Sequence, residues 1–350
     1  MRDVTTTGQA ILGRAERPLY GIDAGGSGTS ACAWDGARWT VPSLNPAAVG
    51  QHASDQNLAD LFGRIREHLS RDGEPASRGL TRPAIWLASA SVSPATAAEE
   101  KSRCAAAAQA AGLRAELVLS NDVTPLLLSA PPDVGHAVIV CGTGSQVLAT
   151  DGRCAPVRVG GCECLGSDEG SAFDLGLFGL RAAVRGLDGR GQPTVLSDLL
   201  ATEAGEPVPE LARRLARTPF PKAVVAALAP IVLRAWLSGD QVAKGLVNAM
   251  IGELVLAVRA GRDRAGITAD WRVSVVGGVM TGCPPLFSKL VHAVASLGAD
   301  PVTLVSDPAA ILVTAMAPLA VTDPLRLADP RIDGDAWYLD LAAIPTERAN

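Results

Sequence analysis

The chain of 350 residues has few aromatic residues, 4% of the total, and few charged ones, 19%. A protein that stacks nucleic-acid bases needs aromatic side chains, and one that binds a phosphate backbone needs an excess of positive charge. The formal net charge of −5 therefore argues against a nucleic-acid partner. Long hydrophobic runs are also missing. No apolar run approaches the roughly 18–20 residues of a membrane-spanning helix, so no membrane partner is expected.

The seven cysteines are odd in number and irregularly spaced, whereas a disulfide framework normally needs an even number. The beginning of the sequence lacks the continuous apolar core and the small cleavage-site residues of a secretory signal peptide. Hydrophobic residues make up 48% of the chain, which is enough to bury the cores of about two domains. We therefore expect a globular, cytoplasmic protein with reduced thiols.

Two glycine-rich turns each follow a short apolar run. The first, DAGGSGT, covers 23–29, and the second, GTGS, covers 142–145. Each is followed by a second apolar run and then by an Asp-Gly dipeptide, at 35–36 and at 151–152. Asp-Gly suits a tight hairpin turn. Both halves of the chain are therefore predicted to begin with a three-stranded antiparallel unit.

Alternating helical and strand patterns follow each unit. In the first half, one helix is predicted to begin near Ser54 or Asp55, and another is predicted to be capped by Ser93 and to end at Gly112. The second half adds an all-helical insertion at about 171–264.

This duplication predicts an α/β protein of two lobes with a cleft between them. The N-terminal lobe is expected over 1–125 and the C-terminal lobe over 126–307. The last helix and the tail, about 308–350, are expected to rejoin the first lobe.

The glycine turns are suited to anion binding, because glycine leaves room for backbone N–H groups to approach a ligand. Ser27, Thr29, Thr143 and Ser145 add hydroxyl donors. Neither turn is a Walker A loop, since the only lysine followed by Ser or Thr is Lys101, which Glu100 precedes. Either turn alone would be most simply an ordinary hairpin turn. A pair at equivalent positions predicts two hairpins that hold one polyphosphate.

Five segments in order resemble the sugar-kinase, Hsp70 and actin superfamily. They are 21–29, 121–122, 138–145, the pair 160–161 with 168–171, and 275–279. Within it, the likeness is to the branch of N-acetylglucosamine kinases, bacterial glucosamine kinases and BadF/BadG/BcrA/BcrD ATPases, over about 18–320. It implies a duplicated ribonuclease H-like (actin-like ATPase) fold with a central nucleotide cleft. The implied protein is a homodimeric ATP-dependent kinase that phosphorylates a hydroxyl of an amino sugar: N-acetylglucosamine, glucosamine or a related aminocyclitol.

On the nucleotide side, the resemblance assigns Asp23 to Mg²⁺. The contact is expected through water, because Mg²⁺ keeps much of its hydration. An aspartate that braces its own turn is the alternative. The residues assigned to ATP are Gly25, Gly26, Ser27, Gly28, Thr29, Gly142, Thr143, Gly144, Ser145, Gly277 and Gly278.

Asp122 follows a predicted strand over 117–120 and is the expected catalytic base. A kinase that phosphorylates an alcohol needs a carboxylate within hydrogen-bond reach of the hydroxyl group. The alternative is that Asp122 caps a helix over 123–130.

The resemblance also implies the acceptor-side residues, which are Asn45, Ser89, Asn121, Asp122, Glu163, Asp168 and Glu169. Asn45 equally suits a turn before proline, and Asp168 or Glu169 could instead cap the helix that follows. The chain departs from the family at Cys162 and Glu163, where relatives carry tryptophan and glycine after the paired glycines. The extra carboxylate of Glu163 suggests the hypothesis of a cationic or hydroxyl-rich acceptor, such as a free amino sugar or an aminocyclitol.

Two other functions are considered. A BadF-type ATPase that drives a conformational change would need cysteines arranged for an iron–sulfur cluster, with the motif that binds it, which the sequence lacks. A non-catalytic sugar sensor would not need both turns and Asp122. Cys162 and Cys164, with Cys154 and His136, do not have the spacing of a zinc site. His68 is expected to be an ordinary surface or helix residue.

Overall fold

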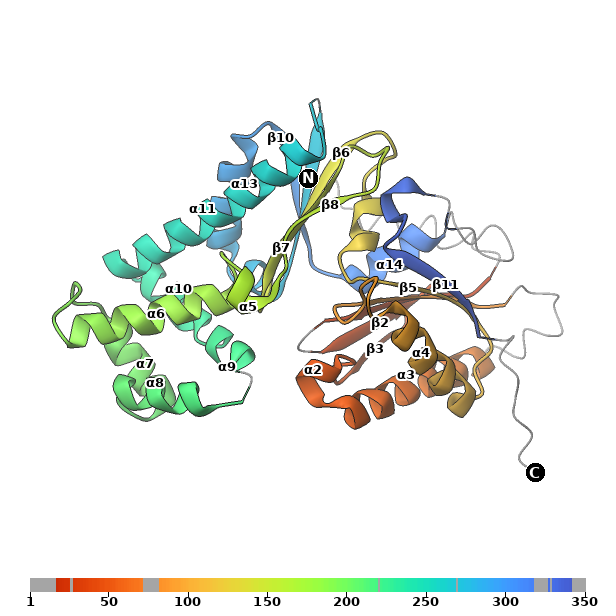
Figure 1. Cartoon of the computed structure of the whole chain (residues 1–350), viewed down its shortest axis with the longest axis horizontal. Helices are drawn as coiled ribbons and strands as arrows, with labels where there is room; N and C mark the ends of the chain where they lie inside the picture. Colours follow the sequence, from red (N-terminus) through yellow and green to blue (C-terminus); the bar gives the residue numbers. More distant parts are fainter. Residues whose placement is uncertain are drawn as a thin grey trace. The chain divides into compact units, whose positions relative to one another are not determined.

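A computed structural model of the chain describes residues 17–25, 28–71, 82–219, 221–268, 270–317, 327 and 329–341 (Figure 1). The described residues form two compact units. Unit 1 contains 17–132, 153–155 and 307–341, and unit 2 contains 133–152 and 156–306, apart from the gaps just given.

Unit 1 is built on a six-stranded sheet with the order β11-β5-β4-β1-β2-β3. The strands are β1 Leu19–Ala24, β2 Thr29–Ala33, β3 Arg38–Val41, β4 Ala84–Ser89, β5 Glu116–Ser120 and β11 Ala336–Asp340. Strands β1, β2 and β3 pair antiparallel, which confirms the predicted three-stranded unit. Strands β1, β4 and β5 run parallel, and β11 pairs antiparallel with β5.

Helices cover both faces of this sheet. They are α2 Pro46–Val49, α3 Gln51–Arg71, α4 Ala97–Ala111, the 3₁₀ helix η2 Thr124–Ser129, α14 Pro308–Met316 and the 3₁₀ helix η4 Pro330–Ile332. In Figure 1, α3 and α4 lie on one side of the sheet and α14 on the other. Tyr20 and Ile22 pack with the first pair, whereas Leu19 and Trp86 pack with α14. Burial on both faces explains why these strands are nearly continuous apolar runs.

Two predicted helix starts in unit 1 are wrong. Ser54 and Asp55 lie inside α3, where Ser54 is buried and Asp55 pairs with Arg103 at 2.8 Å. Ser93 does not cap α4, because it closes a separate turn with Thr96 before the helix begins. A polar residue before an apolar helical pattern is a cap signal, but here side-chain bonds within the tertiary structure override it. The predicted end of α4 at Gly112 is confirmed.

His68, in the last turn of α3, is enclosed by aromatic rings. Its ring centroid lies 5.9 Å from that of Tyr20, 5.3 Å from Trp34 and 4.9 Å from Trp39. Nδ1 shares a hydrogen bond with the Tyr20 hydroxyl at 3.0 Å, and Nε2 lies 3.1 Å from the Asp35 carboxylate. His68 therefore lies in a helix, as expected, but it is buried rather than on the surface, because strands distant in sequence cover it.

Unit 2 repeats the sheet of unit 1, with the order β10-β9-β6-β7-β8. The strands are β6 Gly135–Cys141, β7 Ser145–Thr150, β8 Val157–Gly160, β9 Trp271–Val276 and β10 Ala299–Val305. Strands β6, β7 and β8 pair antiparallel, and β6, β9 and β10 run parallel. In the same direction, the corresponding strands of unit 1 have the order β5-β4-β1-β2-β3. The duplication predicted from the sequence is therefore confirmed in the topology.

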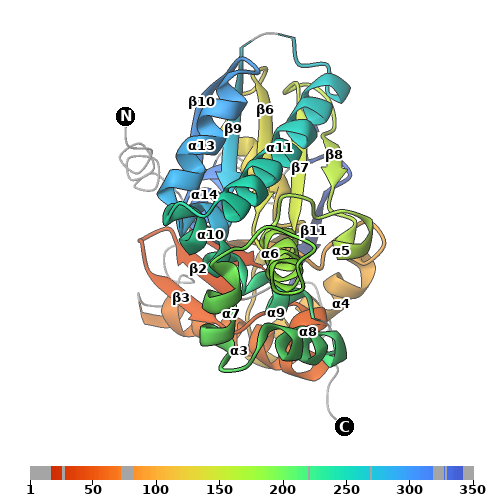
Figure 2. The same ribbon diagram turned by 90° about the vertical axis from the view of Figure 1, so that its left-hand side faces the viewer.

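The predicted helical insertion at about 171–264 is also confirmed. The helices of unit 2 are α5 Glu163–Gly166, α6 Ala172–Leu187, α7 Leu196–Ala204, α8 Val208–Arg217, α9 Lys222–Ala226, α10 Ala229–Leu237, α11 Gln241–Arg264, α12 Gly278–Thr281 and α13 Pro284–Ala295. Figure 2 shows α11 crossing the sheet of unit 2, where it contacts β6, β7 and β8. The helices α6 and α10 also contact α11.

One helix among the described residues, α11, is long and apolar enough to cross a membrane by length and composition. The helix is not an uninterrupted apolar run, because Lys244 and Glu253 lie within it. The buried residues of α11 include Val247, Leu254 and Val258, which belong to the core of unit 2. Packing against that core accounts for the apolar face of the helix.

Candidate active site

The carboxyl ends of three parallel strands bring candidate residues together in unit 1. Ala24 of β1 pairs with Ser89 of β4, and Ala88 of β4 pairs with Ser120 of β5. Because parallel strands end at the same edge of a sheet, Asp23, Ser89 and Asp122 lie at one edge. In open α/β sheets this is the edge at which ligands bind.

The carboxyl group of Asp23 is buried, and its pKa is shifted. Burial, together with the negative charges of Asp122 and Asp307, raises the pKa of Asp23 to about 7. Sequence reasoning missed Asp307, which caps α14 by accepting a hydrogen bond from the amide of Ala310 at 3.1 Å and forms an ion pair with Arg38. An Asp-Pro pair before an apolar run signals a helix start, but nothing in the sequence places it beside Asp23.

The turn that carries Asp122 is fixed by its neighbour. The side chain of Asn121 donates from Nδ2 to the carbonyl of Val92 at 3.1 Å and accepts from the amide of Val123 at 3.4 Å. Asn121 thus positions the turn. The alternative that Asp122 caps a helix is not observed, because η2 begins after Val123 and has no side-chain cap.

The first glycine turn is described in part, since Gly26 and Ser27 lie outside the described residues. A Cβ atom built on Gly28 would meet nothing within 4 Å, and one on Gly25 would meet only the carbonyl oxygen of Gly28, at 3.7 Å. This open space fits a turn whose backbone is approached by a ligand.

The loop that carries Asn45 is bound to the same turn. The amide of Leu44 donates to Oγ1 of Thr29 at 3.3 Å, and Oγ of Ser43 donates to the carbonyl of Gly25 at 3.2 Å. Thr29, predicted to contact phosphate, is buried, and its hydroxyl accepts from this loop. Its role in the described turn is to hold the Asn45 loop beside Gly25.

The second glycine turn joins β6 to β7 and rests on the start of α6. Gly142 donates from its amide to the carbonyl of Gly144 at 3.0 Å, which closes the hairpin. The amides of Ala172 and Phe173 donate to the carbonyls of Gly142 and Thr143, at 2.9 and 3.2 Å. A Cβ on Gly142 would meet nothing within 4 Å. The hairpin is therefore held from one side and open on another, as a phosphate cradle requires.

The pair Gly277 and Gly278 lies against the base of this hairpin. Gly277 has φ 127°, and a Cβ there would be 2.1 Å from the carbonyl oxygen of Cys141. Only glycine allows this approach. A Cβ on Gly278 would meet nothing within 4 Å. The segments predicted to bind phosphate and adenosine are thus adjacent within unit 2.

Asp168 contacts the hairpin directly. It is 3% exposed, and its Oδ1 accepts from the amide of Ser145 at 3.0 Å. A Cβ on Gly144 would lie 2.6 Å from the same oxygen. Ser145 donates from Oγ to the carbonyl of Glu169 at 2.7 Å, so its hydroxyl is also used inside the protein. Neither Asp168 nor Glu169 caps α6, because Ser171 does.

Glu163 is on the surface, but its charge has a partner. Its Oε2 lies 2.6 Å from Nζ of Lys222, which also lies 2.7 Å from Oδ2 of Asp168. Burial lowers the pKa of Lys222, but the two carboxylates outweigh it, and the net shift is upward. Glu163 therefore has a cationic partner within the protein, and the hypothesis of a cationic or hydroxyl-rich acceptor stays a prediction. Sequence reasoning missed Lys222, because no local motif connects it with these acids.

Residues 20–296 match the family described as the BadF/BadG/BcrA/BcrD ATPase family. The chain belongs to this family. A curated relative is the N-acetylmuramic acid/N-acetylglucosamine kinase of Clostridium acetobutylicum, which is 26% identical over 248 residues, covering 69% of this chain and 78% of that protein.

Two solved structures have a similar fold. One, from Porphyromonas gingivalis and assigned as an N-acetylglucosamine kinase, has a TM-score of 0.63 at 18% identity and covers 87% of this chain and 100% of that one. The other, from Chromobacterium violaceum with the same assignment, has a TM-score of 0.63 at 24% identity and covers 85% and 99%. The expected two-lobed, actin-like fold is confirmed, and membership in an ATPase family implies the use of ATP. A homodimer and a cytoplasmic location stay predictions.

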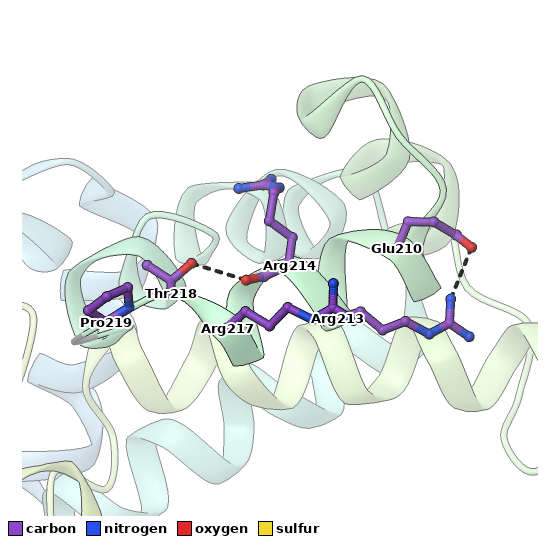
Figure 3. Close-up of a pocket in the computed structure, with 6 residues that line it drawn as sticks. All are labelled: Glu210, Arg213, Arg214, Arg217, Thr218 and Pro219. Carbon is purple, nitrogen blue, oxygen red and sulfur yellow. Dashed lines mark hydrogen bonds and ion pairs between the residues drawn. The ribbon is translucent and has the colours of Figure 1, made fainter.

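A pocket of about 530 Å³ on α8 contains none of the predicted site residues (Figure 3). Its lining is Glu210, Arg213, Arg214, Arg217, Thr218 and Pro219. Arg213 pairs with Glu210 at 3.0 Å, and Arg214 pairs with Glu206 at 2.7 Å. Two of its three arginines are therefore already neutralised.

The described part of the chain holds no group of three or more His, Cys, Asp or Glu side chains that could bind a metal ion. His136 is buried and bonds to Ser274 at 2.9 Å. Asp23, with other negative charges near it, fits a hydrated Mg²⁺ held through water rather than a cage of direct protein ligands.

Proposed function

We propose that the protein is an ATP-dependent kinase that transfers the γ-phosphoryl group to a hydroxyl of an amino sugar. The observation that carries the proposal is the edge of unit 1, where the carboxyl ends of β1, β4 and β5 bring Asp23, Ser89 and Asp122 together. Family membership and the name of the curated kinase support the same reaction.

Asp122 acts as the general base. It accepts the proton of the acceptor hydroxyl as the phosphoryl group is transferred, which requires a rigidly held carboxylate. The two side-chain bonds of Asn121 supply that rigidity. ATP, when bound with Mg²⁺, supplies the phosphoryl group. Asp23 would hold the hydrated cation, and the positive charge of the cation would stabilise the ionised form of Asp23.

The glycine turns bind the phosphates through backbone amides. Open space at Gly28 and at Gly142 lets the backbone approach an anion. Amides fixed before the reaction stabilise charge that develops on the transferred group, without reorganisation. Gly277 and Gly278 bind the adenosine beside the second turn.

On the acceptor side, Asn45, Ser89 and Glu169 are proposed to bind sugar hydroxyls, since amide, hydroxyl and carboxylate groups form several hydrogen bonds each. Because Lys222 offsets Glu163, an uncharged N-acetylated hexosamine is the preferred acceptor. A free amino sugar and an aminocyclitol are weaker candidates. The name of the curated relative adds N-acetylmuramic acid to the compounds to be tested.

The test is ADP release with each of these acceptors, with the phosphorylated position read by NMR. Asp122→Asn is expected to lower kcat by about 10²–10⁴-fold, because the base is lost, while the melting temperature is retained. Asp60→Asn, on the exposed face of α3, is the matched control and keeps full activity.

Two results would contradict the proposal. ADP release that does not depend on any acceptor would indicate an ATPase that drives a conformational change. Binding of a sugar without ADP release would indicate a sensor.

A further inference from the structure

We propose that Lys222 is a positioning residue for the transfer reaction. Its side chain joins the acceptor-side segment 160–168 to the second glycine turn, 142–145. The inference rests on the proposed function for its kinetic consequences. Its structural part concerns contacts inside unit 2 alone.

A continuous chain of contacts leads from the surface to the hairpin. Nζ of Lys222 lies 2.6 Å from Oε2 of Glu163 on α5 and 2.7 Å from Oδ2 of Asp168. The other oxygen of Asp168 accepts from the amide of Ser145 at 3.0 Å. The contacts with Glu163 and with Ser145 are hydrogen bonds to carboxylate oxygens, which are roughly twice as strong as neutral ones, and the contact between Lys222 and Asp168 is an ion pair.

The backbone of Lys222 is itself fixed. It begins α9, which packs on α6, and a Cβ on Gly176 of α6 would lie 2.2 Å from the carbonyl oxygen of Val225. The first amides of α6 bind the carbonyls of Gly142 and Thr143. The same helix therefore holds the hairpin and the helix that carries Lys222, so the lysine has a fixed position relative to the hairpin.

The two acids that Lys222 contacts are held in an unusual backbone conformation. Glu163 has φ 63° and Asp168 has φ 73°, a region that side chains other than glycine rarely adopt. Such residues persist only where surrounding contacts hold them. Lys222 contacts both, so its removal frees both ends of the segment at once.

Charge explains why the lysine is needed. Asp168 is 3% exposed, and a buried carboxylate without a cationic partner is costly. Lys222 lies 2.7 Å from Oδ2 of Asp168 and supplies that partner, while Oδ1 accepts from the amide of Ser145. Removal of Lys222 leaves the carboxylate unpaired and loosens its hold on the hairpin.

Lys222→Met is expected to raise the KM for ATP and for the acceptor by about tenfold each, with kcat changed less than about threefold, because positioning contributes to binding on both sides. Hydrogen exchange of the peptide containing 143–146 speeds up in the unliganded protein. Lys222→Arg, which keeps the charge, is expected to have KM values and hydrogen exchange at 143–146 close to those of the wild-type protein. Lys244→Met, on the exposed side of α11, removes the same charge and leaves all readouts unchanged.

Asp168→Asn separates the two contacts of that residue. The amide oxygen can still accept from Ser145, but no charge is left to pair with Lys222. Combined with Lys222→Met, it gives a double variant no worse in KM than Lys222→Met alone, because no unpaired buried carboxylate remains.

Unchanged exchange at 143–146 and unchanged KM values in Lys222→Met, relative to Lys244→Met, would overturn the inference while kinase activity stands. Additive losses in the double variant would also overturn it. A wild-type protein without acceptor-dependent ADP release would instead refute the proposed function. The exchange measurement, which needs no catalysis, would still decide whether Lys222 orders the hairpin.

Discussion

The buried carboxylate of Asp23, when ionised, lowers the free energy of unfolding of the unliganded protein. Its pKa in the folded protein, about 7, lies above the ordinary value of 3.8. An acid whose pKa is raised by folding destabilises the fold when ionised, so this cost is absent below about pH 4 and complete above about pH 7. Loss of that carboxylate should therefore stabilise the unliganded protein in a pH-dependent way.

Asp23→Asn, which cannot ionise, is expected to raise the melting temperature by roughly 5 °C near pH 8, with the gain shrinking steadily toward pH 5. The measurement is thermal unfolding of both proteins across this range. Asp60→Asn, on the exposed face of α3, should show no such trend. A gain that does not vary with pH would mean that the charge of Asp23 is not its cause.

Some charged residues of the candidate site could be found from local sequence patterns, and others could not. Asp23 and Asp122 each follow an apolar strand, and parallel strands that end at one edge bring them together. Asp307 and Lys222 reach their partners only through helices whose packing no local pattern encodes. Glu163 shows the consequence: its charge was visible in the sequence, but the lysine that neutralises it lies 59 residues away.

At the scale of a single hairpin, two glycines have different reasons to be glycine. A Cβ on Gly144 would meet Asp168 at 2.6 Å, whereas one on Gly142 would meet nothing within 4 Å. Gly144 is a glycine because a side chain there would collide with Asp168. Gly142 is a glycine because its open space is the place that, as proposed, a phosphate enters.

Gly144→Ala is therefore expected to lower the melting temperature, and Gly142→Ala to leave it unchanged while weakening ATP binding by about tenfold or more. Thermal unfolding and calorimetric titration with ATP measure the two effects. Each variant serves as the control for the other. Unaltered ATP affinity in Gly142→Ala would remove the hairpin from the nucleotide site.

The order of the helices and strands could be predicted from the sequence better than the residues at which they begin and end. Hairpin turns and apolar periodicity gave the strands and the helical insertion, because these signals are local. The starts of α3 and α4 were wrong, because Ser54 and Ser93 form tertiary and turn hydrogen bonds instead of capping helices. The strand β11 was not predicted at all. It is a short strand whose pairing partner, β5, lies far back in the sequence.

The two units differ in how the chain builds them. Unit 2 is made almost entirely from one continuous stretch, 133–306, whereas unit 1 needs both 17–132 and residues after 306. The later residues supply α14, which covers the face of the sheet that carries Leu19 and Trp86, and β11, which pairs with the edge of β5. An uncovered apolar face and an unpaired edge strand both favour aggregation over folding.

A fragment of residues 133–306 is therefore expected to fold by itself, with a cooperative thermal transition followed by circular dichroism. A fragment of residues 1–132 should aggregate or remain unfolded, because nothing covers Leu19 and Trp86. Joining residues 307–350 to it through a flexible linker should restore a cooperative transition, since α14 and β11 are then supplied in the same chain. Cooperative folding of 1–132 alone would show that the apolar face does not need α14, and the account of unit 1 as a fold completed by its distant segment would be wrong.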